Sequence, residues 1–97
     1  MDITDFQNLI KNLYYKKDGA RGIEKTFMWL IEEVGELSSI LKEKRPNIEK
    51  ASEEIADIMA WTISIANLLE IDVEKALLDK YPNKCRKCNK NPCECAK

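Results

Sequence analysis

Two long stretches with the 3.6-residue repeat of apolar side chains, joined by a short polar connection, most constrain how this 97-residue chain can fold. The first stretch runs from about residue 23 to 44 and the second from about 47 to 69. Their apolar stripes consist of Ile23, Phe27, Leu30, Val34, Leu37 and Leu41 in the first, and Ala51, Ile55, Ile58, Thr62, Ile65 and Leu69 in the second. Residues 43–47 between them are few enough to make the two helices antiparallel neighbours. The sequence therefore predicts a helical hairpin that packs stripe against stripe.

Acidic residues lie beside each apolar stripe, whereas ordinary solvated charges would lie opposite it. Glu33 and Glu36 flank the first stripe, and Glu54 and Asp57 flank the second. In an antiparallel pair both flanks emerge on the same side, and the four positions are level, because 33 with 57 and 36 with 54 each average to 45. The four carboxylates are therefore expected to converge on a small volume beside the two helices.

Carboxylates held this close repel one another and lose solvation, which is costly unless a cation compensates. Oxygen ligands around a concave site suit Mg²⁺ or Mn²⁺, ions that commonly bridge carboxylates and substrate phosphates. A solvated acidic face is the alternative for either acidic pair taken alone. The matched level of all four acids favours a metal site.

The acidic segments also carry a family resemblance. E-E-V-G-E at residues 32–36, followed by E-I-A-D at residues 54–57, resembles the E-E-x-x-E…E-x-x-D signature of the MazG-like all-α nucleotide pyrophosphohydrolases. The similarity covers approximately residues 4–84. It implies an all-α, four-helix-type bundle that assembles by oligomerisation, as a homodimer or homotetramer. It also implies Mg²⁺-dependent attack of water on a nucleoside triphosphate, which releases a monophosphate and pyrophosphate, with house-cleaning of non-standard nucleotides as one such activity.

The same resemblance assigns roles to five acids. Carried over position by position, it implies Glu33, Glu36, Glu54 and Asp57 as the ligands of Mg²⁺ or Mn²⁺. Glu32, the first acid of the motif, is implied beside them as a group that either orients the water or supports a metal ligand. These five residues are the expected catalytic set.

Two tryptophans and one arginine are candidates for binding the substrate. Trp29 and Trp61 share the flanks with the acids, so each ring is expected either to stack on a nucleobase or to pack a dimer interface. Arg21 lies at the end of a glycine-containing segment, residues 16–22, that is expected to form a loop next to the first acidic helix. There Arg21 would reach substrate phosphates, or remain a solvated loop charge.

Two shorter helices complete the expected domain. Thr4 and Gln7 form a Thr-x-x-Gln capping box that would begin the first helix, which is expected to end near Tyr15. Asp72 is the expected N-cap of the last helix, which must stop around Tyr81 because a proline follows.

The residues after this last helix are further candidates for the substrate site. The resemblance implies that side chains here contact phosphate or sugar, which points to Lys80, Asn83 and Lys84. A lysine at a helix C-terminus is also simply favourable to the helix dipole.

The tail, residues 85–97, is expected to be a separate unit from the helical domain, residues 1–84. It carries all four cysteines of the chain, which are Cys85, Cys88, Cys93 and Cys95. Two tight pairs separated by four residues predict a tetrahedral Cys₄ zinc knuckle, and two disulfides are the alternative. From Lys84 onward there are five Lys or Arg against a single Glu. An alternative function is therefore a nucleic-acid-binding adaptor, in which the basic knuckle is active and the helices form a dimerisation platform.

Composition bounds the remaining possibilities. Hydrophobic residues make up 44% and charged residues 34% of the chain, and the net charge is −1. Neither a secretory signal pattern nor a membrane-spanning stretch is evident, so a cytoplasmic protein without a membrane partner is expected. A chain this small buries only a modest core when alone, which also favours self-association.

Overall fold

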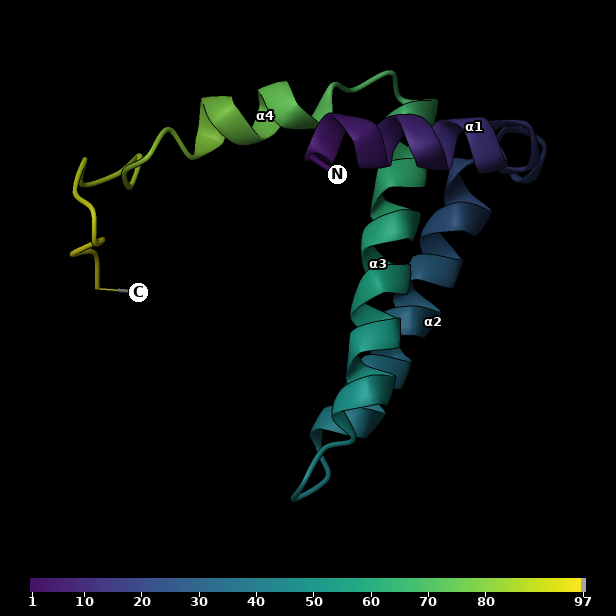
Figure 1. The fold of residues 1–97 in the computed structure, drawn as a ribbon, viewed down its shortest axis with the longest axis horizontal. Helices are drawn as coiled ribbons and strands as arrows, with labels where there is room; N and C mark the ends of the chain where they lie inside the picture. The colour runs from purple at the N-terminus through teal and green to yellow at the C-terminus, as the bar shows by residue number, and fades with distance from the viewer. Residues whose placement is uncertain (97) are drawn as a thin grey trace.

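The computed structural model describes residues 1–96, and within them it contains four α-helices and no strand. The helices are α1 (Ile3–Arg21), α2 (Ile23–Leu41), α3 (Ile48–Leu68) and α4 (Val73–Lys80). Figure 1 shows α2 and α3 as an antiparallel hairpin, with α1 lying across the end where α2 begins and α3 ends. The predicted all-α class and the helical hairpin are confirmed. Lys97, the last residue of the expected tail unit, lies outside the described residues.

Helix α1 begins two residues earlier than the sequence indicates. Its N-cap is Asp2, whose carboxylate accepts a hydrogen bond of 2.7 Å from the backbone N–H of Asp5, while the Asp5 carboxylate accepts one of 3.2 Å from the N–H of Asp2. This reciprocal pair is a capping box. The capping box expected from Thr4 and Gln7 is therefore wrong, because an acidic pair upstream already satisfies the first free amides.

Gln7 instead connects three elements. Its Nε2 donates to Asn67 Oδ1 at 3.0 Å and to the carbonyl oxygen of Ile71 at 2.7 Å, and its Oε1 accepts from the N–H of Val73 at 3.1 Å. One side chain of α1 thus binds the end of α3 and the start of α4. The N-cap predicted for α4 is confirmed, since the side chain of Asp72 accepts from the backbone N–H of Lys75.

The expectation that α1 ends near Tyr15, followed by a loop over residues 16–22, is wrong. The helix continues to Arg21 through Gly19, although a helical glycine costs about 1 kcal/mol relative to alanine. It ends at Gly22, which has φ of 90° and forms a one-residue turn into α2. Glycine adopts this conformation without the steric cost that other residues meet, so the turn needs no loop.

The two long helices pack along a different line from the predicted apolar stripes. The line of buried or half-buried residues is Thr26, Trp29, Leu30, Glu33, Leu37 and Ile40 on α2, and Ala51, Glu54, Ile58, Trp61 and Ile65 on α3. Each helix is therefore rotated so that its acidic flank enters the contact. Phe27, Val34 and Ile55, which were expected in the seam, remain 51%, 44% and 48% exposed. The stripe-to-stripe packing is corrected to a seam that contains Glu33 and Glu54.

The core of the single chain is small. Its buried apolar residues are Ile10, Ala51, Ile63 and Ala66, of which Ile63 and Ala66 lie in the C-terminal part of α3, the end that α1 crosses in Figure 1. Two of these four are alanines, which bury little area. Among the described residues, no helix has both the length and the apolar character needed to cross a membrane.

Candidate functional site

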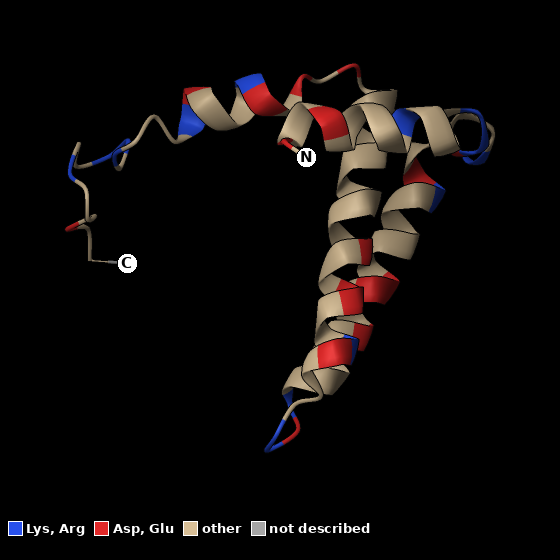
Figure 2. Ribbon diagram, viewed as in Figure 1, with Lys and Arg blue, Asp and Glu red and all other residues tan. Residues whose placement is uncertain are grey.

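Acidic residues face one another across the middle of the hairpin. Figure 2 shows their red bands on both α2 and α3. Glu33, Glu36 and Glu54 each offer one carboxylate oxygen, and these three oxygens all lie within 4.8 Å of one another. Glu33 and Glu36 come from successive turns of α2, and Glu54 comes from the facing turn of α3. The predicted convergence of acids from both helices is present for these three.

The three carboxylates are not paired with any base that the structure describes. Within residues 1–96, no lysine or arginine forms an ion pair with any of them. Glu33 Oε2 and Glu54 Oε2 are both buried and have no hydrogen-bond partner. Two partnerless, buried carboxylate oxygens cost free energy unless something outside the chain satisfies them. Their position beside a third carboxylate and their hard oxygen chemistry fit Mg²⁺ or Mn²⁺.

The crowding of the carboxylates raises the pKa of two of these acids. The negative charge of Glu54 is the main cause that raises the pKa of Glu36 above its ordinary value, with smaller contributions from Glu32 and Asp57. The nearby carboxyl group of Glu33, which favours a proton on Glu54, is the main cause that raises the pKa of Glu54, followed by loss of solvation. A bound cation would lower these pKa values again, because its positive charge favours the charged form of every carboxylate near it.

Asp57 and Glu32 lie next to the three-acid cluster but outside it. Both are exposed, and both act on Glu36 through their charge. Asp57 also contributes to the raised pKa of Glu54, one helical turn before it. The fourth expected ligand, Asp57, is thus near the cluster without contributing an oxygen to the tight group.

The two tryptophans pack against one another beside the acids. The Trp29 and Trp61 rings meet edge to face, with their centroids 5.4 Å apart and their planes at 84°. The guanidinium of Arg21 lies 4.4 Å from the Trp29 centroid and 5.0 Å from the Trp61 centroid. Such cation–π contacts stabilise the contact between α1 and the hairpin. Stacking of these rings on a nucleobase stays a prediction.

Arg21 belongs to a buried polar cluster rather than to a loop. Its Nη1 lies 2.8 Å from Oδ1 of Asp18, whose side chain is 1% exposed, and it also donates to Thr26 Oγ1 at 3.3 Å. Thr26 in turn donates to the carbonyl oxygen of Gly22 at 2.8 Å. Asp18 and Thr26 were missed from the sequence, where the three-residue spacing of Asp18 and Arg21 was the available signal. Contact of Arg21 with substrate phosphate also stays a prediction.

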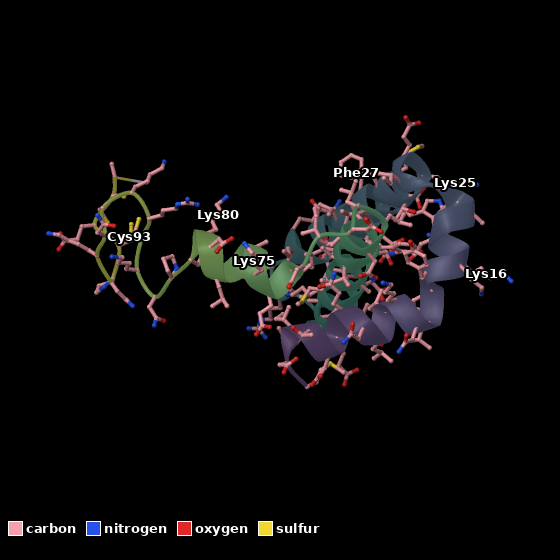
Figure 3. All side chains as sticks on the ribbon, turned by 90° about the horizontal axis from the view of Figure 1, so that it is seen from above. Lys16, Lys25, Phe27, Lys75, Lys80 and Cys93 are labelled. Carbon is pink, nitrogen blue, oxygen red and sulfur yellow. The ribbon has the colours of Figure 1, made fainter. Side chains whose placement is uncertain are left out.

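The three-acid cluster lies far from the other predicted substrate residues of the same chain, which are Lys80, Asn83 and Lys84. They line a cavity of about 870 Å³ together with the tail cysteines, beyond the end of α4. Figure 3 shows Lys80 and Cys93 well apart from the helices of the acidic cluster. The reason is that α4 contacts α1 and leads away from the hairpin.

The tail brings the four predicted cysteines into a second cluster, in which one Sγ from each lies within 4.8 Å of the others. Backbone N–H groups of Glu94 and Lys90 lower the pKa of Cys88 to about 6. Hydrogen bonding with Cys93 raises the pKa of Cys95 to about 11. The backbone N–H groups thus favour the thiolate form of Cys88.

Comparison with known proteins agrees with this geometry. A family model described as the MazG nucleotide pyrophosphohydrolase domain matches residues 21–89. The crystal structure of iMazG from Vibrio DAT 722 superimposes with a TM-score of 0.67 and 28% sequence identity, over 86% of this chain and 98% of that chain. No curated protein matches the chain significantly.

The helical part of the chain therefore defines an all-α nucleotide hydrolase unit. Because the family model covers well over half of its length, the chain belongs to the MazG nucleotide pyrophosphohydrolase family. Membership supports hydrolase activity on nucleotides in general, and enzymes of this family generally use divalent metal ions. The match ends at residue 89, so Cys93 and Cys95 lie beyond it.

Proposed function

We propose that the protein is a divalent-cation-dependent nucleoside triphosphate pyrophosphohydrolase, which hydrolyses a nucleoside triphosphate to a monophosphate and pyrophosphate. The observation that carries this proposal is the acidic cluster, where two buried carboxylate oxygens have no hydrogen-bond partner among residues 1–96. Such a group of acids destabilises the metal-free fold, which supports a bound cation as the ligand that compensates them. The substrates would include non-standard nucleotides.

Each acid of the cluster has a proposed role. Glu33, Glu36 and Glu54, with Asp57 beside them, would hold Mg²⁺ or Mn²⁺. When bound, such a cation offsets the phosphate charge and lowers the pKa of an attacking water. Glu32 is exposed next to the cluster, where it would orient that water and accept its proton.

The remaining substrate contacts come from two places. Trp29 and Trp61 would offer the edge of their packed pair to the nucleobase, with Arg21 holding the rings in position. Lys80 and Lys84, with Asn83, would contact phosphates of a nucleotide bound at another copy of the chain, because their own cavity lies beyond α4.

The exposed apolar faces of the hairpin are proposed to bind a second copy of the chain. Phe27, Ile31 and Val34 on α2, and Ile55 and Met59 on α3, are all between 44% and 51% exposed. Burial of apolar area contributes about 25 cal/mol per Å², so these faces favour a homodimer or homotetramer. Two hairpins packed on these faces would form the expected four-helix bundle.

The test is pyrophosphate release from a panel of canonical and damaged nucleoside triphosphates with Mg²⁺. Glu36→Gln should lower kcat by more than about 100-fold, because groups that merely orient metal ligands already contribute about 10–100-fold. Mg²⁺ affinity, measured by calorimetry, should fall in the same variant. Circular dichroism should show that its helices are retained.

Glu53→Gln is the matched control, since this exposed acid precedes Glu54 on α3 and lies outside the cluster. It should keep wild-type turnover and Mg²⁺ affinity. Full activity in Glu36→Gln, or equal losses in both variants, would end the proposal.

A further inference from the structure

The four tail sulfurs have the spacing of a single metal tetrahedron. Cys85 Sγ and Cys95 Sγ are 3.6 Å apart, and Cys88 Sγ and Cys93 Sγ are 3.9 Å apart. Four sulfurs at about 2.3 Å from one Zn²⁺ would be separated by about 3.8 Å, the edge of the tetrahedron. All four are free thiols, and all lie within 4.8 Å of one another. Two disulfides would require only that each pair be close, and not that both pairs share one centre.

The backbone of the tail is folded around this centre. Two backbone hydrogen bonds close the turn from Cys85 to Cys88. The N–H of Asn89 donates to the carbonyl oxygen of Cys85 at 2.7 Å, and the N–H of Cys85 donates to the carbonyl oxygen of Lys90 at 2.9 Å. Asn89 has φ of 60°, a left-handed conformation that asparagine tolerates better than most residues. This residue turns the chain directly after the second cysteine.

Two backbone amides also point at sulfur. The N–H of Glu94 donates to Cys88 Sγ at 3.5 Å, and the N–H of Cys95 donates to Cys93 Sγ at 3.3 Å. Hydrogen bonds of this kind stabilise negative charge on the acceptor, and a metal requires the thiolate rather than the thiol.

The tail has no apolar core that would hold this shape. Between residues 81 and 96 no residue is buried, and the half-buried ones are Cys85, Cys88 and Cys95. A segment of this size cannot offset its conformational entropy with so little burial. A structural Zn²⁺ supplies the missing free energy, because small metal domains of this kind fold only when the metal is bound.

We propose that Cys85, Cys88, Cys93 and Cys95 bind one Zn²⁺ in a closed structural site. Binding releases the thiol protons, and four thiolates around Zn²⁺ leave a net charge of about −2 with no open position for a substrate. Lys84, Arg86 and Lys87, which line the same cavity as the cysteines, offset part of that charge. Two of the four ligands lie beyond the family match, so the site is an addition to the helical enzyme.

The experiment uses the full chain, purified under reducing conditions and washed with a weak chelator to remove loosely held ions. Elemental analysis should find about one zinc per chain. Replacement by Co²⁺ should give the visible absorption bands of a tetrahedral cobalt–thiolate centre. Cys88→Ser with Cys95→Ser should lose the metal, while the helical circular dichroism signal of α1–α3 stays.

Lys87→Ser is the matched control, because this exposed residue lies between two ligands and offers no sulfur. It should keep one zinc per chain. Zinc retained by the double cysteine variant, iron in place of zinc, or a zinc-free protein whose thiols react only after reduction would each overturn the proposal. Loss of zinc without loss of hydrolysis would leave the acidic site standing, so the two proposals fail separately.

Discussion

Replacing Asp18 by alanine should destabilise the fold by about 3 kcal/mol. The side chains of Asp18 and Arg21 are 1% and 14% exposed and lie 2.8 Å apart. Removing one partner of a buried ion pair typically costs about 3–5 kcal/mol, because the other charge is left buried and unpaired. Arg21 would keep its contacts with Thr26 and with the two tryptophan rings, which places the cost at the lower end of that range.

The assay is thermal and urea unfolding followed by circular dichroism. A loss of about 3 kcal/mol corresponds to a fall in Tm of about 12–24 °C for a domain of this size, at about 4–8 °C per kcal/mol. All variants must be compared at one protein concentration, because self-association makes Tm depend on concentration.

Asp79→Ala is the control, because Asp79 and Lys75 form an ion pair of the same 2.8 Å length. Those side chains are 62% and 72% exposed, so solvent screens their attraction and their separation should cost far less than that of the buried pair. Equal losses in the two variants, or a loss below about 1 kcal/mol for Asp18→Ala, would refute the reasoning from burial.

Two further predictions concern pH and assembly. The raised pKa values of Glu36 and Glu54 mean that the folded state binds their protons more tightly than the unfolded state. Without metal, this contribution to stability should be complete below about pH 4.3 and should be lost as pH rises through the folded pKa values. In EDTA, Tm should therefore fall as pH rises, and Glu36→Gln should make this fall smaller. Sedimentation at micromolar concentration should show a dimer or larger species, which Phe27→Lys on the exposed face of α2 should dissociate. Leu78→Lys, at an exposed apolar position of α4 outside the hairpin, should leave it assembled, and a fully active monomeric wild type would contradict the assembly.

Much of the site could be predicted because it depends on spacing along helices. The level of the acids followed from their positions about residue 45, and it holds whichever face each helix buries. Glu36 and Glu54, which this level argument pairs, meet for this reason even though the predicted seam was wrong, whereas Asp57, paired with Glu33, contributes no oxygen to the tight group. The cysteine cluster was predictable in the same way, since short spacing alone brings Cys85 and Cys88 together.

The rotation of the hairpin could not be predicted from periodicity. A pattern of apolar residues indicates which face of a helix avoids water, but it does not distinguish burial within one chain from burial between two chains. What decides the rotation is the packing of Trp29 on Trp61 beneath Arg21, which requires α1 to reach the hairpin. That contact was missed because the segment ending in Arg21 was interpreted as a loop.

The position of the acids also explains why so much apolar surface remains on the hairpin. With Glu33 and Glu54 turned into the contact between α2 and α3, residues such as Phe27 and Ile55 are turned out of it. Half-buried carboxylates repel one another, and the enclosed apolar residues of the single chain are few, so neither feature stabilises an isolated metal-free hairpin. A cation between the acids and a second copy over the apolar faces would each remove one of these costs. Because the same two helices carry both surfaces, assembly would hold the acids at the spacing that the cation requires, and metal binding would in turn favour the assembled form.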